Sequence, residues 1–253
     1  MPQLLDSDDV RRRLERDRPW AAFSLADLDP PYAQHATWFG SPRSDAIVLV
    51  YDAYDPPIVF CQGDAEECEA ILSEEEVVSR TPGAYINVTE RLRPIVDRTF
   101  ATSDLHGMSR MLLQAGLPVT ASNTPAAALG PDDLDALQRL YEKEPPAFFL
   151  PQQVTNGVYF GVRESGDLVA VAGTHVVSVT GRVGAIGNVY TRPDCRGRGL
   201  AAEVTGAVAR ELRRRGITTI VLNVTGSNAT ARRVYERLGF REYCVFHEGV
   251  ARR

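Results

Sequence analysis

A short glycine-containing turn between a strand and a helix constrains the fold of this chain more than any other feature. The turn is the stretch Arg196-Gly197-Arg198-Gly199-Leu200-Ala201, and a β-like run over residues 185–191 precedes it. After the turn, apolar side chains recur at helical spacing, at Leu200, Ala201, Val204 and Val208. The sequence therefore predicts a strand, a tight turn and a helix in this order.

The same turn has the chemistry of an anion site. Glycines let a backbone approach a ligand closely. The first N–H groups of a helix have no acceptor within the helix and lie at the positive end of its dipole, so they favour phosphate oxygens. We therefore expect the turn between Arg196 and Ala201 to bind the pyrophosphate of an anionic cofactor.

Composition limits the partners. The 253 residues are 44% hydrophobic and 24% charged, which is ordinary for a soluble globular protein of one or two domains. The formal net charge of -5 argues against general binding to nucleic acid or to an anionic membrane, because both need a basic face. Any anion site must therefore be local.

Neither a metal nor a membrane span is expected. We find no CxxC pair and no matching histidine spacing for the cysteines, which are Cys61, Cys68, Cys195 and Cys244. Neither zinc nor a disulfide framework is therefore predicted. No run reaches the roughly 18 apolar residues that span a bilayer. The charged residues near the N-terminus precede no apolar segment typical of a signal peptide, so we expect a cytoplasmic protein.

Two α/β halves follow one another along the chain. In the first half we predict helices at residues 7–15, 65–72 and 103–114, and strands at 35–39, 45–51, 57–61 and 84–89. In the second half we predict a helix at 131–141, a hairpin of 158–162 and 168–179, strands at 186–191, 217–224 and 241–248, and helices after the glycine turn and at 228–239. Turn residues between the halves, at Gly116, Pro118, Asn123 and Pro125, set the boundary after residue 117.

Two motifs in the second half together resemble the GCN5-related N-acetyltransferase (GNAT) superfamily. The R/Q-x-x-G-x-G/A loop of that family corresponds to residues 196–201. Its closing helix corresponds to Asn228-x-x-Ala231-x-x-x-Tyr235, followed by Leu238-Gly239-Phe240. The two motifs stand at the family's spacing with a buried strand between them, and they cover about the last third of the chain. The hairpin extends the resemblance back to around residue 118.

The resemblance implies a fold and a different role for each half of the chain. We expect an α/β (α+β) GNAT fold at residues 118–253, with a mixed, mostly antiparallel sheet flanked by helices. Residues 1–117 are expected to be a degenerate GNAT-like α/β domain, as in FR47-like and tandem members. Residues 62–65 lie where a second glycine turn would be, but have no such pattern. We therefore expect the first domain to shape the acceptor cleft without binding CoA.

The resemblance also implies an activity, which is transfer of an acetyl or other acyl group from acetyl-CoA to an amine. Tyr235 would be the general acid that protonates the departing CoA thiolate. The cofactor-binding residues would be Val189, Tyr190, Thr191, Arg196, Gly197, Arg198, Gly199, Leu200, Ala201, Asn228 and Arg232, with either Arg232 or Arg233 at the ribose phosphate. The acceptor would be a small-molecule amine or an amine of a protein or peptide, and both a monomer and a homodimer stay open.

Spacing and glycine placement support part of this site independently. Asn228 and Tyr235 are seven residues apart, about two helical turns, so both lie on one helix face. Gly187 within a strand indicates a bulge or a close approach to the backbone, which would suit a ligand beside the strand.

The general base is less well defined. Many members of the superfamily have a glutamate on the strand before the glycine turn, but residues 185–189 contain no acid. His175 on the preceding strand has a suitable pKa range, and Glu142 or Glu144 would act through water. An amine that binds already neutral needs no base.

Two other classes of function were considered. Residues 197–202 also satisfy the G-x-G-x-x-A dinucleotide fingerprint of an oxidoreductase. That fingerprint belongs after a first parallel strand, with an acidic residue about twenty positions later, and this context is missing. A module that binds CoA without catalysis stays open, although Tyr235 and the intact turn argue against it.

Overall fold

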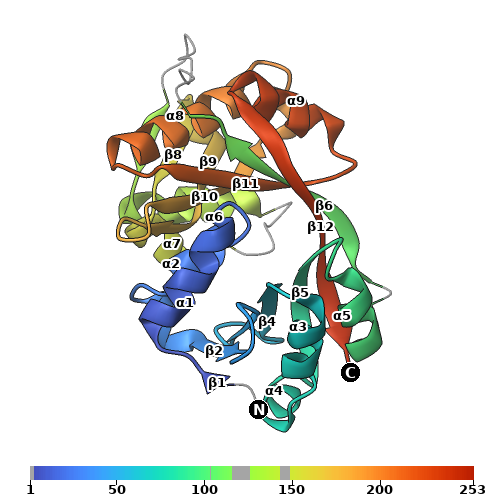
Figure 1. Ribbon diagram of the computed structural model, residues 1–253. Coiled ribbons are helices and arrows are strands. Elements are labelled where there is room, and N and C mark those ends of the chain that lie inside the picture. The colour runs from blue at the N-terminus through green and yellow to red at the C-terminus, as the bar shows by residue number, and fades with distance from the viewer. Residues whose placement is uncertain (1–2, 103, 116–125, 143–148) are drawn as a thin grey trace. The chain divides into compact units, whose positions relative to one another are not determined.

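The chain divides into two compact units. The computed structural model describes residues 3–102, 104–115, 126–142 and 149–253. The first unit comprises residues up to 110 together with 225–227 and 242–253, and the second comprises 111–224 and 228–241. Three strands, β6 (His106–Leu113), β11 (Thr219–Thr225) and β12 (Phe240–Arg252), therefore contribute residues to both units (Figure 1).

The first unit is a mostly antiparallel sheet with helices. Its strand order is β1 (Gln3–Leu4), β2 (Ala36–Gly40), β3 (Ile47–Tyr51), β4 (Ile58–Gln62), β5 (Gly83–Thr89) and the second half of β12. Only β4 and β5 pair in parallel, with Val59 opposite Ile86. The helices are α1 (Ser7–Leu14), α2 (Ala22–Ala26), α3 (Ala65–Leu72), α4 (Glu75–Arg80) and α5 (Arg93–Thr99). Every residue of β3 is buried, which explains its unbroken apolar sequence.

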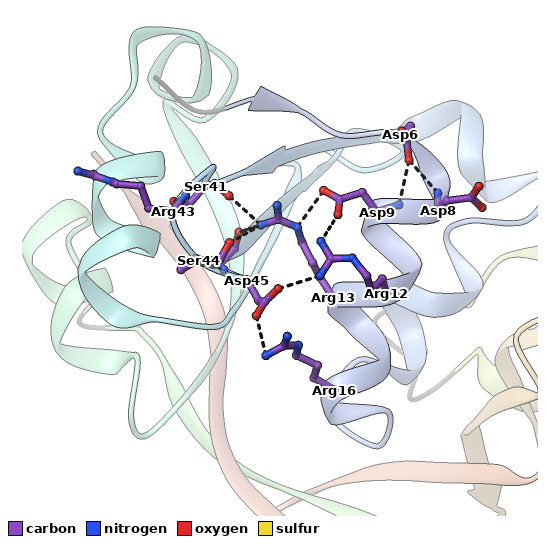
Figure 2. Close-up of polar contacts among 11 residues, drawn as sticks. Asp6, Asp8, Asp9, Arg12, Arg13, Arg16, Ser41, Arg43, Ser44 and Asp45 are labelled. Atoms are coloured by element: carbon purple, nitrogen blue, oxygen red, sulfur yellow. Dashed lines mark hydrogen bonds and ion pairs between the residues drawn. The ribbon is translucent and has the colours of Figure 1, made fainter.

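A buried arginine ties α1 to the loop between β2 and β3 (Figure 2). Arg13 is 5% exposed. Its Nη1 donates to the carbonyl oxygens of Ser41 (3.0 Å), Ser44 (2.8 Å) and Ala46 (2.9 Å). Its Nε donates to Asp9 Oδ2 at 3.1 Å. The guanidinium thus donates to three loop carbonyls in a buried place, and of these the Ala46 carbonyl also accepts the N–H of Ser41 at 3.1 Å.

The second unit is a three-layer α/β/α structure. Its strand order is β11 (Thr219–Thr225), β10 (Val183–Thr191), β9 (Asp167–Ser178), β8 (Tyr159–Glu164) and β7 (Ala127–Leu129). The helices are α6 (Leu134–Tyr141), α7 (Pro151–Asn156), α8 (Leu200–Arg214) and α9 (Ala229–Arg237). On β9, Ala170 and Ala172 pack in the cluster that contains α8, whereas Val171 packs with α6 and α7. Because neighbouring residues of a strand face opposite ways, the two helix layers cover opposite faces of the sheet.

The elements run in the same order twice. Each series has an edge strand, two helices, three antiparallel strands, a helical crossover, a parallel strand, a helix and a last strand. The first series runs from β1 to β6 and the second from β7 to β12. The last strands are exchanged, because Phe246–Arg252 of β12 pairs with β5 and β6 lies beside β11 in the strand order.

The structure confirms the predicted fold class and most of the second half. The helix at 131–141, the hairpin at 159–178, the strand–turn–helix around residue 197 and the last helix are all present. The helix predicted at 103–114 is wrong, because His106–Leu113 is a strand. Most of that strand is buried, so its apolar residues also match a helical spacing by chance. Four short helices, α2, α4, α5 and α7, were not predicted.

The unit boundaries differ from the predicted domains. The predicted boundary after residue 117 falls in residues 116–125, outside the described residues. The compact units divide after residue 110 instead, and Glu242–Arg253 belongs to the first unit rather than to a domain of residues 118–253. The exchanged last strand explains this difference, because its second half pairs with β5. Within the described chain, no helix has both the length and the apolar character that a bilayer span requires.

Candidate functional site

The glycine turn has the backbone conformation that its sequence predicts. Gly197 has φ of 78° and Gly199 has φ of 81°, both in the left-handed region that favours glycine. Gly199 is the N-cap residue of α8. A Cβ atom added at either position would meet no atom of the described residues within 4 Å. The glycines are therefore needed for their conformation, and the space beside them is open.

Backbone donors at this turn lack partners. The first N–H of α8 with a backbone acceptor outside the helix is that of Glu203, which donates to the Gly199 carbonyl at 3.1 Å. In the described part of the chain, the N–H groups of Leu200, Ala201 and Ala202 have no acceptor. Donors at the positive end of a 15-residue helix that have no acceptor among the described residues have the chemistry that favours an anion.

The two arginines of the turn have different surroundings. Arg196 Nε donates to the Thr191 carbonyl oxygen at 3.0 Å, and its guanidinium lies 5.9 Å from the centre of the Tyr190 ring. Arg198 instead forms a bidentate pair with Glu164, with N–O distances of 3.1 and 2.5 Å. The hydrogen bond from Arg198 lowers the pKa of Glu164. Arg198 would therefore have to leave this exposed carboxylate to contact a phosphate.

One edge of β10 becomes free where the predicted backbone contacts lie. The parallel pairing of β10 with β11 ends at Ile186 opposite Leu222, although both strands continue. On its other side β10 still pairs with β9 up to Thr191, with a register shift between Gly187 and Tyr190. The predicted residues Val189, Tyr190 and Thr191 thus lie on a segment with one edge that no described strand pairs with.

A buried amide network holds the irregularity in β10. Asn188 is 7% exposed and has φ of 52°, which is unusual for a residue other than glycine. Its Nδ2 donates to Gln153 Oε1 at 3.0 Å and to the Tyr159 hydroxyl oxygen at 2.7 Å. The Tyr141 hydroxyl donates to the Asn188 carbonyl oxygen at 2.7 Å, and burial raises the pKa of Tyr141, which keeps it a neutral donor. The sequence signal for this network was an asparagine in a strand, a residue that tolerates left-handed backbone, and it was missed.

His175 explains the glycine at position 187. A Cβ added to Gly187 would lie 2.0 Å from His175 Nε2, so the imidazole lies against the glycine backbone. The predicted close approach is therefore present, but a side chain makes it, which corrects the expectation of a ligand there. Burial lowers the pKa of His175 to about 4, so the ring is neutral at pH 7 and a weak base.

Helix α9 carries the remaining predicted residues. Asn228 is its N-cap, and its Oδ1 accepts the N–H of Ala231 at 3.0 Å. Tyr235 is 8% exposed and packs edge-on against Phe240, with ring centres 6.3 Å apart. Burial raises the pKa of Tyr235 to about 12, so the phenol keeps its proton at neutral pH. Arg232 lies on α9 one turn after Asn228.

The other candidate bases are not placed at this site. Glu142 is exposed just after α6, and Glu144 lies outside the described residues. Among the described residues, no group of three or more His, Cys, Asp or Glu side chains is arranged to hold a metal ion.

Known proteins resemble the second unit in sequence and the whole chain in fold. The acetyltransferase (GNAT) family profile matches residues 119–240. Mycothiol acetyltransferase of Rhodococcus jostii is 36% identical over 51% of this chain and 42% of its own length. The ribosomal protein bS18 alanine N-acetyltransferase of Escherichia coli is 33% identical over 38% of this chain and 64% of its own length. A GNAT-family crystal structure from Novosphingobium aromaticivorans covers 94% of this chain and 99% of its own, with 22% identity and a TM-score of 0.62.

These matches indicate the class of protein. Residues 119–240, slightly less than half of the chain, match the acetyltransferase (GNAT) family. The match spans less than half the length of the mycothiol acetyltransferase, and the solved structure shares the fold of both units.

Proposed function

We propose that this protein is an N-acyltransferase that moves an acetyl group from acetyl-CoA to a primary amine by direct attack. The observation that carries the proposal is the glycine turn, where the N–H groups of Leu200, Ala201 and Ala202 have no acceptor in the described chain and the space beside Gly197 and Gly199 is open. The unpaired edge of β10 adds a second strip of backbone for the same substrate. The match of residues 119–240 to the acetyltransferase (GNAT) family favours acetyl-CoA as that substrate.

The residues divide the contacts with acetyl-CoA between them. The N–H groups from Gly197 to Ala202 would bind the pyrophosphate, with charge added by Arg196. Arg198 would exchange Glu164 for a phosphate, which costs little because that ion pair is exposed to solvent. Backbone groups of residues 189–191 would bind the pantetheine arm, while the Asn228 amide nitrogen and Arg232 would contact the rest of the cofactor.

The reaction needs one proton donor and one route for the amine proton. The amine nitrogen attacks the thioester carbon, and a backbone N–H near Val189 stabilises the oxyanion. When the C–S bond breaks, Tyr235 donates its proton to the thiolate. A phenol with a pKa of about 12 stays protonated until this step. The amine proton passes to the neutral His175 or to water. If the amine binds already deprotonated, no base is needed.

We also propose that the first unit is a degenerate copy that does not bind CoA. Its element order repeats that of the second unit, so residues 62–65 correspond to the glycine turn. There Gly63 is closed in, since an added Cβ would lie 2.5 Å from Ala46 Cα. Asp64 caps α3 by accepting the N–H of Glu67 at 3.1 Å. The Asp64 carboxylate and the Ala46 backbone thus occupy the place where a pyrophosphate would need N–H donors and free space. We propose that this unit instead shapes the cleft that binds the acceptor.

Transfer assays with the full chain test the proposal. The relatives' names indicate different acceptors, so acetyl-CoA is supplied with pools of small-molecule amines and of peptides with N-terminal alanine, and products are identified by mass spectrometry. Tyr235→Phe should lower kcat about a hundredfold with little change in KM. Gly199→Val should instead raise the KM for acetyl-CoA strongly, and Arg237→Ala, at an exposed position of α9, serves as control.

Three outcomes would contradict parts of this proposal. CoA binding without transfer to any amine would favour the non-catalytic CoA-binding module. A Tyr235→Phe variant with unchanged turnover would remove the acid role from Tyr235. If calorimetry detects no heat when CoA is added, both the acyltransferase and the non-catalytic CoA-binding module are rejected.

A further inference from the structure

A cavity of about 530 Å³ lies in the second unit, on the side of the sheet that α6 covers. Its described lining comes from α6, from β8 and β9 around their turn, and from the end of β10 with the residues just after it. Small-molecule sites have volumes of roughly 300–1,000 Å³, so the cavity has room for a ligand. None of the described lining residues belongs to the turn of residues 196–201, so the cavity is separate from the candidate pyrophosphate site.

Part of the cavity wall is apolar. Leu140 and Leu168 line it, and both are buried in the cluster that packs α6 against the sheet. Tyr190 also lines it, and its ring lies edge-on to Tyr141 of α6, with ring centres 6.0 Å apart. The Tyr190 side chain thus lies against α6, whereas the contacts proposed for acetyl-CoA use the backbone of this residue. An apolar group of a ligand would gain by burial against these side chains.

Three arginines line the cavity, and two of them already have acidic partners. Arg163 Nη2 lies 2.6 Å from Asp133 Oδ1, and Arg163 Nη1 donates to the Gly166 carbonyl oxygen at 2.9 Å. Arg192 Nε lies 2.7 Å from Asp194 Oδ1. These two guanidinium charges are therefore balanced by the protein itself.

One positive and one negative group at the cavity remain. They are Arg139 on α6 and Asp167 at the start of β9. Within the described residues, neither side chain forms a hydrogen bond or an ion pair, and the two do not pair with each other. Their charged atoms are therefore more than 4.0 Å apart. Two opposite charges thus line one cavity with space between them.

We propose that this cavity binds a dipolar ion with an apolar side chain, which is an amino acid or a short peptide with both termini free. The guanidinium of Arg139 would bind the carboxylate, and Asp167 would bind the ammonium group. The apolar side chain would pack on Leu140, Leu168 and Tyr190. A ligand that is only an anion would leave Asp167 unmatched, and one that is only a cation would leave Arg139 unmatched.

The bound dipolar ion is not the acceptor of the proposed acetyl transfer. An ammonium group that is paired with a carboxylate keeps its proton, because the opposite charge favours the charged form. Without a lone pair, its nitrogen cannot attack a thioester. The site therefore goes beyond the proposed function and uses no step of it.

The test titrates the full chain at pH 7, at constant ionic strength and without CoA. The ligands are leucine, the dipeptide leucyl-leucine, the same dipeptide with an acetylated N-terminus, and the same dipeptide with an amidated C-terminus. Binding is followed by calorimetry and by saturation-transfer NMR of the ligand methyl protons. Each blocked dipeptide should bind at least about fivefold more weakly than the free one, since it loses one charged hydrogen bond and leaves one protein charge unmatched. The tighter binder of leucine and leucyl-leucine identifies the length of ligand that the cavity takes.

Variants assign the two preferences to residues. Arg139→Gln should bind the free and the amidated dipeptide equally well, because the carboxylate has lost its partner. Asp167→Asn should bind the free and the acetylated dipeptide equally well for the corresponding reason. Asp135→Asn is the matched control, since it removes one charge from an exposed position of α6 that does not line the cavity, and both preferences should persist.

Three outcomes would overturn the proposal. They are the absence of saturable binding of both leucine and the free dipeptide, equal affinity for all the dipeptides, and preferences that persist in Arg139→Gln and Asp167→Asn. Displacement of the dipeptide by inorganic phosphate, lost in Arg192→Gln, would instead show a site for anions and would also reject the dipolar ion. Because Arg139 and Asp167 are exposed, neither variant threatens folding, and the ligand series on the unmodified protein is independent of both. Because CoA is absent throughout, failure here leaves the acetyl-transfer proposal standing, and failure of acetyl transfer leaves this result intact.

Discussion

Replacing Asn188 by alanine and by glycine should separate backbone strain from hydrogen bonding in β10. Both variants lose the two bonds from Nδ2, to Gln153 and to Tyr159. Only alanine is also forced to keep a Cβ at φ of 52°. The comparison therefore isolates the conformational cost at one buried position.

The magnitudes follow from the local contacts. The two lost bonds cost about 1 kcal/mol each. The cost is no larger because Gln153 Oε1 still accepts from Leu150 N at 3.1 Å and is not left without a donor. Removing Asn188 Oδ1, which is buried without a partner, recovers about 1 kcal/mol. Left-handed strain adds about 1–2 kcal/mol for alanine. We therefore expect Asn188→Ala to lower the free energy of unfolding by about 2–3 kcal/mol, and Asn188→Gly by about 1 kcal/mol less.

Urea unfolding of the two variants, followed by circular dichroism, measures this difference. Tyr141→Phe is a useful third variant, because it removes only the bond to the Asn188 carbonyl and should cost about 1 kcal/mol. Steady-state assays should show a lower kcat/KM for acetyl-CoA in both Asn188 variants, with alanine worse. A glycine variant no more stable than the alanine variant would refute the strain argument.

Three further predictions concern buried groups. Gly187→Ala should displace the His175 imidazole, which lies 2.0 Å from the new Cβ, and any activity that depends on His175 should fall in rate assays as far as in His175→Gln. Arg13→Met should destabilise the protein by about 3 kcal/mol in urea unfolding, since it removes the guanidinium donor from the Ser41 and Ser44 carbonyls, whereas the Ala46 carbonyl keeps the N–H of Ser41. Arg16→Met, whose side chain is 63% exposed (Figure 2), should change stability by less than about 0.5 kcal/mol, and equal losses would contradict the role of burial. The folded-state pKa of Asp27, about 8, lies above its unfolded value near 4. The stability that it contributes is therefore complete below about pH 4 and is lost as pH rises to 8, by about 1.4 kcal/mol per unit at the steepest. Asp27→Asn should remove this slope in unfolding measured at pH 5, 6 and 7, and a parallel slope in the variant would count against it.

Local sequence determined the parts of the site that depend on local physics. The left-handed conformations of Gly197 and Gly199, the helix that follows them and the cap at Asn228 all follow from residues a few positions apart. The edge that β10 leaves free also begins near the predicted Val189. Such features are fixed by turn chemistry and periodicity.

Features that depend on distant residues could not be predicted in this way. Gly187 indicated a close approach, but nothing in its neighbourhood identified His175 as the group that makes it. The pairing of Arg198 with Glu164 joins residues 34 positions apart. Strand β6 was taken for a helix because burial on both faces hides the alternation that identifies a strand.

Because the last strands are exchanged, each half of the chain supplies a strand that the sheet of the other half needs. A chain cut after residue 117 would leave β5 without its β12 neighbour and β11 without β6. Each fragment would then present a bare row of amide and carbonyl groups, the kind of edge along which polypeptides aggregate. Residues 118–253 made alone should therefore self-associate, whereas two fragments produced together could complement each other and restore a soluble pair.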